Sequence, residues 1–234
     1  MKAVLFDLDG TLLPMDQDKF IEAYMGTMAK RLGAHGYEAN TLTKGVFAGI
    51  KSMVTNDGSI TNEEAFWNAF VGVVGEQVKE DLPISDDYYR NEFQSVAEVC
   101  GYDARAKEII DYIKEKGYQV VLATNPLFPS IATESRMRWA GLKKEDFALY
   151  TTYENSSFCK PNPKYYLEIL EKIGVEPKDC LMVGNDVTED MVAETLGMKV
   201  FLLTDCLINK ENRDISVYPN GSFKELLAYL EENL

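Results

Sequence analysis

The sequence has a single histidine among its 234 residues, and that scarcity removes several kinds of catalytic site. A Ser-His-Asp or Cys-His mechanism would need His35 as its base, yet its neighbours are small and uncharged, so no acidic residue is placed to orient the ring. A zinc site is disfavoured for the same reason. The four cysteines form no C-x-x-C pair, and we expect reduced thiols at Cys100, Cys159, Cys180 and Cys206.

Basic residues are also few, and long apolar runs are missing. Lys and Arg number 24 against 38 Asp and Glu, which gives a net charge of −14. This balance argues against nucleic acid or an anionic membrane as the main partner. No segment is typical of a membrane span or a signal peptide, so we expect a cytoplasmic protein. The sequence does not indicate an oligomeric state.

From about residue 103 onward, apolar runs of strand length alternate with amphipathic helical segments. This alternation predicts an α/β fold, a Rossmann-like doubly wound parallel sheet with helices on both faces. The predicted strands cover 3–6, 118–123, 147–153, 180–183 and 199–203, and the predicted helices cover 103–116, 129–139, 161–173, 188–196 and 222–233.

The stretch 16–100 has helical periodicity and no evident strand. Helices are predicted over 18–32 and 86–99, and Thr61-x-x-Glu64 is typical of a capping box that opens a third. The aromatic residues of that third helix are interpreted as packing residues of the insert, with stacking on a ligand as the alternative; they are Phe66, Trp67 and Phe70. We therefore expect a Rossmann-like core from 1–15 and 101–234, interrupted by a helical domain over 16–100.

Asp7-Leu8-Asp9-Gly10-Thr11 directly follows the first predicted strand. Two carboxylates this close repel each other unless a cation lies between them, which favours a divalent metal that binds oxygen ligands. Asp, Gly and Thr are also ordinary turn residues, so a turn that caps the next helix is the alternative.

Two further predicted strands end in polar residues. Thr124 follows one of them, with Asn125 beside it, and Gly184-Asn185-Asp186 follows another. In a doubly wound sheet, ligands bind beyond the carboxyl ends of the strands. The three polar clusters are therefore expected to converge on one crevice.

With these motifs in place, the chain resembles the haloacid dehalogenase-like (HAD) hydrolase superfamily, in the form that carries a helical cap between its first two motifs. The resemblance covers essentially the whole chain. The matching positions are Asp7-Leu8-Asp9-Gly10-Thr11-Leu12, Thr124, Lys160 of Cys159-Lys160-Pro161, and Gly184-Asn185-Asp186 with Glu189-Asp190.

The resemblance implies different catalytic roles for Asp7 and Asp9. Asp7 would attack a phosphoryl group and form an aspartyl-phosphate, while Asp9 would protonate the leaving oxygen and then activate water. Mg²⁺ would bind Asp7, the backbone carbonyl of Asp9, and an acid of the fourth motif. Thr124, Asn125 and Lys160 would bind the phosphoryl oxygens.

The register of the fourth motif is open, because Asn185 stands where many relatives have Asp. We favour Asp186 as the metal ligand, since a carboxylate binds Mg²⁺ better than an amide does. Asn185 and Asp190 are then expected to support the site indirectly, and Glu189 to face solvent on a helix.

Specificity is expected to come from the helical insert. Lys44 and Lys51 are seven residues apart, so they would share one face of any helix there. A substrate-facing patch is one interpretation of these lysines, and an ordinary solvated face is the other.

The resemblance implies a Mg²⁺-dependent phosphatase that acts on a small phosphorylated metabolite. Asp9 favours phosphate chemistry over dehalogenation, because dehalogenases of the superfamily do not carry Asp at that position. The alternatives are a phosphomutase of the same superfamily and a non-catalytic protein that binds a phosphorylated ligand. The sequence does not identify the substrate.

Overall fold

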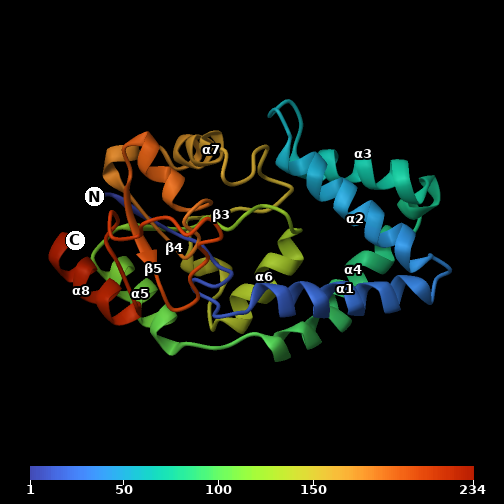
Figure 1. Cartoon of the computed structure of the whole chain (residues 1–234), viewed down its shortest axis with the longest axis horizontal. Coiled ribbons are helices and arrows are strands. Elements are labelled where there is room, and N and C mark those ends of the chain that lie inside the picture. Colours follow the sequence, from blue (N-terminus) through green and yellow to red (C-terminus); the bar gives the residue numbers. More distant parts are fainter.

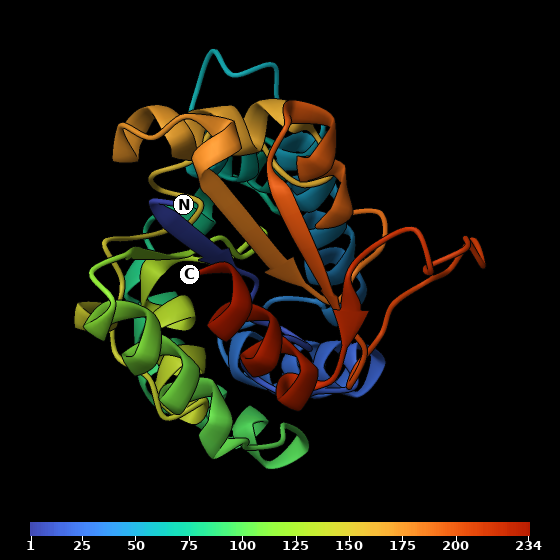
Figure 2. The same cartoon turned by 90° about the vertical axis from the view of Figure 1, so that its left-hand side faces the viewer.

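The protein is described by a computed structural model of residues 1–234, the side chain of Leu82 excepted. Its centre is a six-stranded parallel sheet in the order β3-β2-β1-β4-β5-β6, seen in Figure 2. The strands are β1 (Ala3–Phe6), β2 (Gln119–Leu122), β3 (Leu149–Tyr150), β4 (Cys180–Gly184), β5 (Lys199–Leu203) and β6 (Asn220–Gly221).

Side chains alternate along each strand and build one apolar core on each face of the sheet. From β1, Val4 and Phe6 face the helices α5 (Ala104–Glu115), α6 (Ser130–Trp139) and α8 (Phe223–Asn233). Ala3 and Leu5 face α7 (Pro163–Ile173) and the 3₁₀ helix η5 (Met191–Leu196) on the other side. Helices therefore cover both faces, and the predicted α/β fold is confirmed.

All named elements between β1 and α5 are helices, and they lie beyond one end of the sheet (Figure 1). An antiparallel bridge joins Met15 to Cys100 where the chain leaves the sheet and returns to it. These elements are α1 (Gln17–Gly33), α2 (Ala39–Val54), α3 (Asn62–Val74), η1 (Glu76–Lys79), α4 (Leu82–Arg90) and η2 (Glu92–Val99). None of the described helices is both long enough and apolar enough to cross a bilayer.

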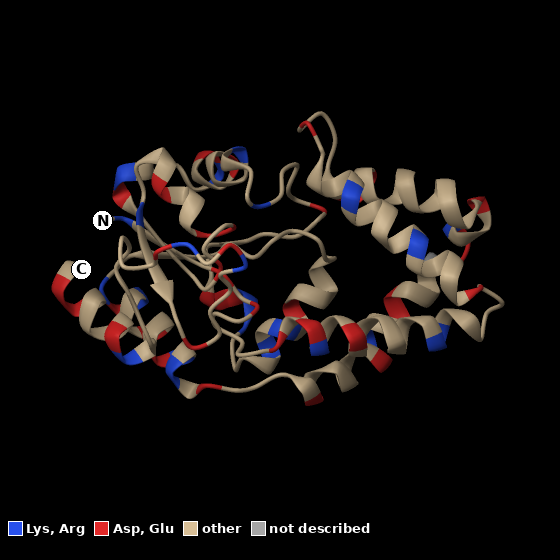
Figure 3. Ribbon diagram, in the orientation of Figure 1, with Lys and Arg blue, Asp and Glu red and all other residues tan. Residues whose placement is uncertain are grey.

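Local signals explain where these helices begin. The Asp16 side chain accepts hydrogen bonds from the first-turn N–H groups of α1. Thr61 and Glu64 form the predicted capping box at the start of α3, so the pattern read from the sequence is confirmed. Acidic side chains are spread over both the sheet and the helical insert (Figure 3).

Three predicted elements differ from the structure. The helix expected over 188–196 is a turn followed by η5, because the side chain of Asp190 turns inward to accept from the backbone N–H of Asp186. The strand expected over 147–153 shrinks to the two residues of β3 at the sheet edge. The helix expected over 86–99 is divided between α4 and η2.

Candidate active site

The loops after β1, β2 and β4 meet at the carboxyl edge of the sheet, where they enclose a cavity of about 40 Å³. Its walls carry most of the side chains singled out from the sequence, and Gln17 lines it as well. Those predicted residues are Asp7, Asp9, Thr124, Asn125, Asn185, Asp186, Glu189 and Asp190. The structure therefore brings together residues that lie more than a hundred positions apart. We refer to this space as the acidic cavity.

Lys160 links two of the acids that line the acidic cavity. Its Nζ donates to Asp7 Oδ1 at 2.8 Å and to Asp190 Oδ1 at 2.6 Å, and its side chain is almost fully buried. Burial alone would lower the pKa of Lys160, but the carboxylates of Asp190 and Asp7 raise it well above its ordinary value. The ammonium group therefore stays charged beside Asp7.

The fourth-motif residues have distinct hydrogen bonds. Asn185 accepts from the Thr11 hydroxyl at 3.0 Å and donates to the Cys206 carbonyl at 2.6 Å, so both ends of its amide join loops. Asp190 accepts from Lys160 and from the Asp186 N–H. Oδ1 of Asp186 accepts from the backbone N–H groups of Thr188 and Glu189, and among the described hydrogen bonds Oδ2 of Asp186 has none. Asp186 thus has a carboxylate oxygen free for a ligand.

Gly10 lets the loop after β1 approach this cluster closely. Its φ of +86° lies in the left-handed region, and a Cβ there would overlap the Asn185 amide. The turn can therefore hold both acids of the first motif beside the loop that follows β4.

Arg136 on α6 pairs with Asp9, a contact that the sequence did not predict. Its Nη1 donates to Asp9 Oδ2, its side chain is inaccessible to solvent, and its guanidinium lies 4.3 Å from the centre of the Phe128 ring. The other Asp9 oxygen, Oδ1, is buried without a hydrogen-bond partner among the described residues. Burial raises the pKa of Asp9, and Arg136 opposes that rise.

Glu189 corrects another sequence-based expectation. It was expected to face solvent, yet its carboxylate accepts from the Asn125 amide at 3.0 Å and lines the acidic cavity. The inward turn after β4, rather than a regular helix, directs it there. Burial, reinforced by the nearby Asp186 and Asp7, raises the pKa of Glu189 to about 7, while Lys160 opposes the shift.

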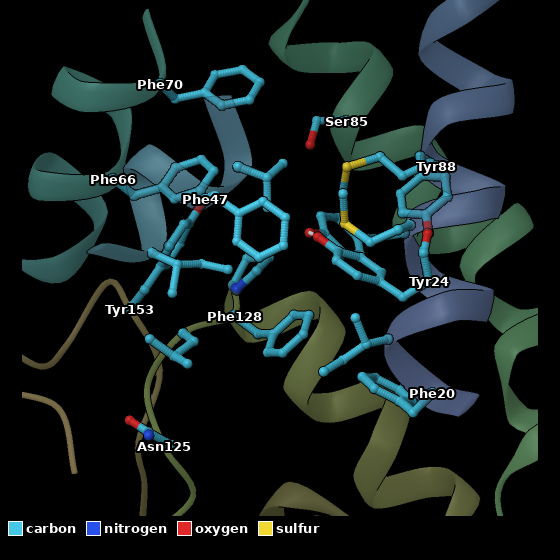
Figure 4. A pocket seen from close by; sticks show the side chains of 18 of the residues that line it. Phe20, Tyr24, Phe47, Phe66, Phe70, Ser85, Tyr88, Asn125, Phe128 and Tyr153 are labelled. Carbon is cyan, nitrogen blue, oxygen red and sulfur yellow. Dashed lines mark hydrogen bonds between the residues drawn. The ribbon is translucent and has the colours of Figure 1, made fainter. Parts of the chain in front are cut away.

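A second and larger cavity of about 270 Å³ lies between the sheet edge and the helical insert (Figure 4). Its wall is mostly aromatic and aliphatic, and Phe66, Trp67 and Phe70 contribute to it as well as packing on one another. We refer to it as the apolar cavity. Lys44 and Lys51 are exposed on α2 and are not among its described lining residues, so their contact with a substrate stays a prediction.

The acidic cavity has the oxygen ligands and the charge that a divalent cation requires. Five carboxylates line it, and Lys160 and Arg136 pair with Asp7, Asp9 and Asp190. Among the described side chains this leaves Asp186 and Glu189 without a cationic partner. No three acidic, histidine or cysteine side chains described here are already arranged as a complete metal cage. The donor chemistry nevertheless fits Mg²⁺, which usually takes one or two carboxylates and keeps waters.

A parallel α/β sheet that holds an Asp-x-Asp pair, a buried lysine and further acids at its carboxyl edge is the arrangement expected of the hydrolases that the sequence motifs resemble. The family model for haloacid dehalogenase-like hydrolases matches residues 1–193, so the chain belongs to this family. The resemblance drawn from the motifs and the expectation of a hydrolase are both confirmed.

Relatives and solved structures agree with this placement. The chain is 26% identical over 205 residues to a phosphoglycolate phosphatase of Nitrosospira multiformis, covering 86% of this chain and 82% of that protein. Its fold is similar to that of a HAD phosphatase from Thermococcus onnurineus, with a TM-score of 0.60, 20% identity and 98% of both chains covered. It is also similar to a Bacteroides thetaiotaomicron HAD enzyme solved with magnesium and inorganic phosphate, with a TM-score of 0.53, 21% identity, and 93% and 98% of the two chains covered.

Proposed function

We propose that this protein is a Mg²⁺-dependent phosphatase that hydrolyses a small phosphate monoester through an aspartyl-phosphate on Asp7. The observation that carries the proposal is the position of Asp9. This acid lines both cavities, so it lies where an ester oxygen would join a phosphoryl group in the acidic cavity to an organic group in the apolar one.

In the first step, a carboxylate oxygen of Asp7 attacks phosphorus while the bond from phosphorus to the ester oxygen breaks. Asp9 gives its proton to the departing oxygen, which leaves as an alcohol. In the second step, water attacks the aspartyl-phosphate, Asp9 takes a proton from that water, and phosphate leaves with Asp7 restored. Asp9 begins and ends the cycle in the same protonation state.

Lys160 and Thr124 would bind the oxygens of the transferring phosphoryl group. The Lys160 ammonium, 2.8 Å from Asp7, would neutralise charge on the phosphoryl oxygens beside the nucleophile. The carbonyl of Thr124 accepts from Thr151 and Tyr165 at 2.6 and 2.8 Å, which fixes the backbone that presents its hydroxyl. Asn125, held by Glu189, borders the same space and could donate to the phosphoryl group or to the ester oxygen.

Mg²⁺ would be held by Asp7, the backbone carbonyl of Asp9 and Asp186. When bound, it would offset the excess of carboxylates and stabilise negative charge on the transferring phosphoryl group. Asp186 is preferred over its neighbours because both ends of the Asn185 amide and both Asp190 oxygens already have protein partners.

The direct test is hydrolysis of p-nitrophenyl phosphate with Mg²⁺, followed by EDTA and then by excess Mg²⁺. We expect release that EDTA abolishes and Mg²⁺ restores. No metal-dependent release from this ester or from a broad panel of phosphorylated metabolites would overturn the proposal. Retention of activity in Asp7→Asn would overturn the nucleophile assignment alone.

A further inference from the structure

The apolar cavity indicates which alcohol the phosphate group is attached to. Of its described lining residues none is Lys or Arg, and the ring-bearing ones come from both the insert and the sheet side. Figure 4 shows their side chains around a common space, and among them are Phe20, Tyr24, Phe66, Phe70, Phe128 and Tyr153. A wall of this composition favours burial of an uncharged organic group.

Several polar atoms on this wall are already paired within the protein. The hydroxyls of Tyr24 and Tyr89 share a hydrogen bond at 3.0 Å, and the Tyr88 hydroxyl bonds Thr27 at 2.9 Å. Asp81 accepts from the Tyr37 hydroxyl at 2.5 Å. These paired groups are therefore less available to a ligand, and a strongly hydrated ligand would lose water on entering a cavity whose wall is otherwise mostly apolar.

The charges around the apolar cavity disfavour an anionic leaving group. Asp9, Asp81 and Glu189 line it and bring acidic groups to it. The buried cation Arg136 lies over the Phe128 ring and is already paired with Asp9. A carboxylate on the ligand would thus be buried with no described cation on the cavity wall to receive it.

The two cavities share Asp9, Gln17, Asn125 and Glu189, so a single molecule can extend from one into the other. An apolar cavity of about 150 Å³ binds benzene, and on that scale 270 Å³ accommodates about ten non-hydrogen atoms. We propose that the substrate is a phosphate monoester of an uncharged, predominantly apolar alcohol or phenol of about that size. This inference rests on the phosphatase function proposed above.

The composition of the apolar cavity also bears on phosphoglycolate, the substrate for which some relatives of this chain are named. Glycolate, the alcohol that phosphoglycolate releases, is small and carries a carboxylate. It would leave most of the apolar cavity unfilled and would place its charge near Asp9 and Glu189. We therefore expect phosphoglycolate to be a poor substrate.

The cavity opens toward solvent beside two exposed apolar side chains. Ile21 on α1 is 50% exposed and Phe47 on α2 is 59% exposed, and both line it. Exposed apolar residues at a cavity mouth are suited to contacting the outer part of an apolar ligand. Phe47 is also a favourable position for substitution, because little of its side chain is in the folded core.

The test uses n-alkyl phosphates from ethyl to hexyl, whose leaving alcohols differ little in acidity beyond the shortest members. We expect kcat/KM to rise up to about fourfold for each CH₂ that enters the cavity. Propyl phosphate, similar in size to phosphoglycolate, should exceed it by at least about tenfold in kcat/KM. Equal or better hydrolysis of phosphoglycolate, with no dependence on chain length, would overturn the substrate class while the phosphatase function stands.

Two variants test whether the dependence of kcat/KM on chain length comes from the apolar cavity. Phe47→Ala should lower kcat/KM for hexyl phosphate by about fivefold and change that for ethyl phosphate less than twofold. Val54→Ala is the matched control, because Val54 is an exposed apolar residue of the same helix that is not among the described lining residues. If Phe47→Ala lowered kcat/KM equally for ethyl and hexyl phosphate, the assignment of this cavity would be contradicted. The same would follow if Val54→Ala weakened the dependence on chain length as much as Phe47→Ala does.

Binding separates a failure of the substrate class from a failure of the function. Calorimetric titration with ethyl- and hexylphosphonate, which cannot be hydrolysed at an ester bond, measures the cavity alone. Tighter binding of hexylphosphonate without hydrolysis of any ester would reject the phosphatase function. It would still support the proposal that the ligand is a phosphorylated compound with an apolar organic group. Equal affinity for the two phosphonates would reject the ligand class.

Discussion

Arg136 and Asp9, which are 127 positions apart in the sequence, form an ion pair at the junction of the acidic and apolar cavities. No solvent reaches the arginine side chain, and the paired acid is the one assigned to proton transfer. The arginine therefore holds the Asp9 side chain at this junction.

The first prediction concerns the energy of this pair. Arg136→Met should lower the free energy of unfolding by about 3 kcal/mol, because it leaves a largely buried carboxylate without its cation. In an Asp9→Asn background the same change should cost at least about 1 kcal/mol less. Urea unfolding of the four proteins measures this coupling. A coupling energy near zero would show that the two side chains do not depend on each other.

The second prediction concerns the proton that Asp9 supplies. Asp9→Asn should lower kcat for alkyl phosphates by about 10²- to 10⁴-fold, because an alkoxide is a poor leaving group without a proton donor. In the first turnover, release of nitrophenolate from p-nitrophenyl phosphate should be slowed much less than release of the alcohol, since nitrophenolate leaves without protonation. Later turnovers on both esters also lose the activation of water by Asp9, so rapid-quench kinetics of the first turnover check this. Equal slowing of the first turnover on both esters would remove Asp9 from protonation of the leaving group.

The third prediction concerns the metal site. Asp186→Asn should raise the Mg²⁺ concentration needed for half-maximal activity by about tenfold or more, because an amide is a weaker ligand for this hard cation. Glu189→Gln serves as a neighbouring control and should change it less. Mg²⁺ titrations after EDTA treatment give both values. If Glu189→Gln has the larger effect, the metal ligand is misassigned.

Asp186 and Glu189 also show how much of the site could be predicted from the sequence. Asp7, Asp9, Thr124, Lys160 and Asp186 follow strand ends or lie in recognisable motifs, so their convergence follows from the rule for parallel sheets. Glu189 did not follow that rule, because the turn after β4 depends on Asp190 accepting from the Asp186 N–H, a contact made only in the folded chain.

The contact of Arg136 could not be read from the sequence for a similar reason. Which side of α6 faces the site depends on how that helix packs between the sheet and the insert. The apolar cavity could not be predicted for the same reason, since Phe66, Trp67 and Phe70 have the spacing of packing residues and also border a cavity. Periodicity predicts a buried helix face and says nothing of the space left between two faces.

The fourth prediction concerns the pH dependence of stability without metal. The folded protein binds a proton at Glu189 up to about pH 7, whereas an unfolded glutamate releases it near its ordinary pKa of 4.5. The contribution of this group is fully present below the lower value and is lost as pH rises toward the higher one. From about pH 5 to about pH 7.5, the free energy of unfolding should therefore decline by about 2 kcal/mol more in the wild type than in Glu189→Gln. Urea unfolding in EDTA measures the difference, and identical pH profiles would refute it.

The central claim is that phosphate passes through Asp7, and trapping the intermediate tests it most directly. The enzyme is mixed with substrate and Mg²⁺, quenched within one turnover, and treated with borohydride, which reduces an aspartyl-phosphate to homoserine. Peptide mass spectrometry then identifies the reduced residue. The account predicts homoserine at position 7 in the wild type and none in Asp7→Asn. Reduction at another residue, or rapid hydrolysis with no residue reduced, would contradict it.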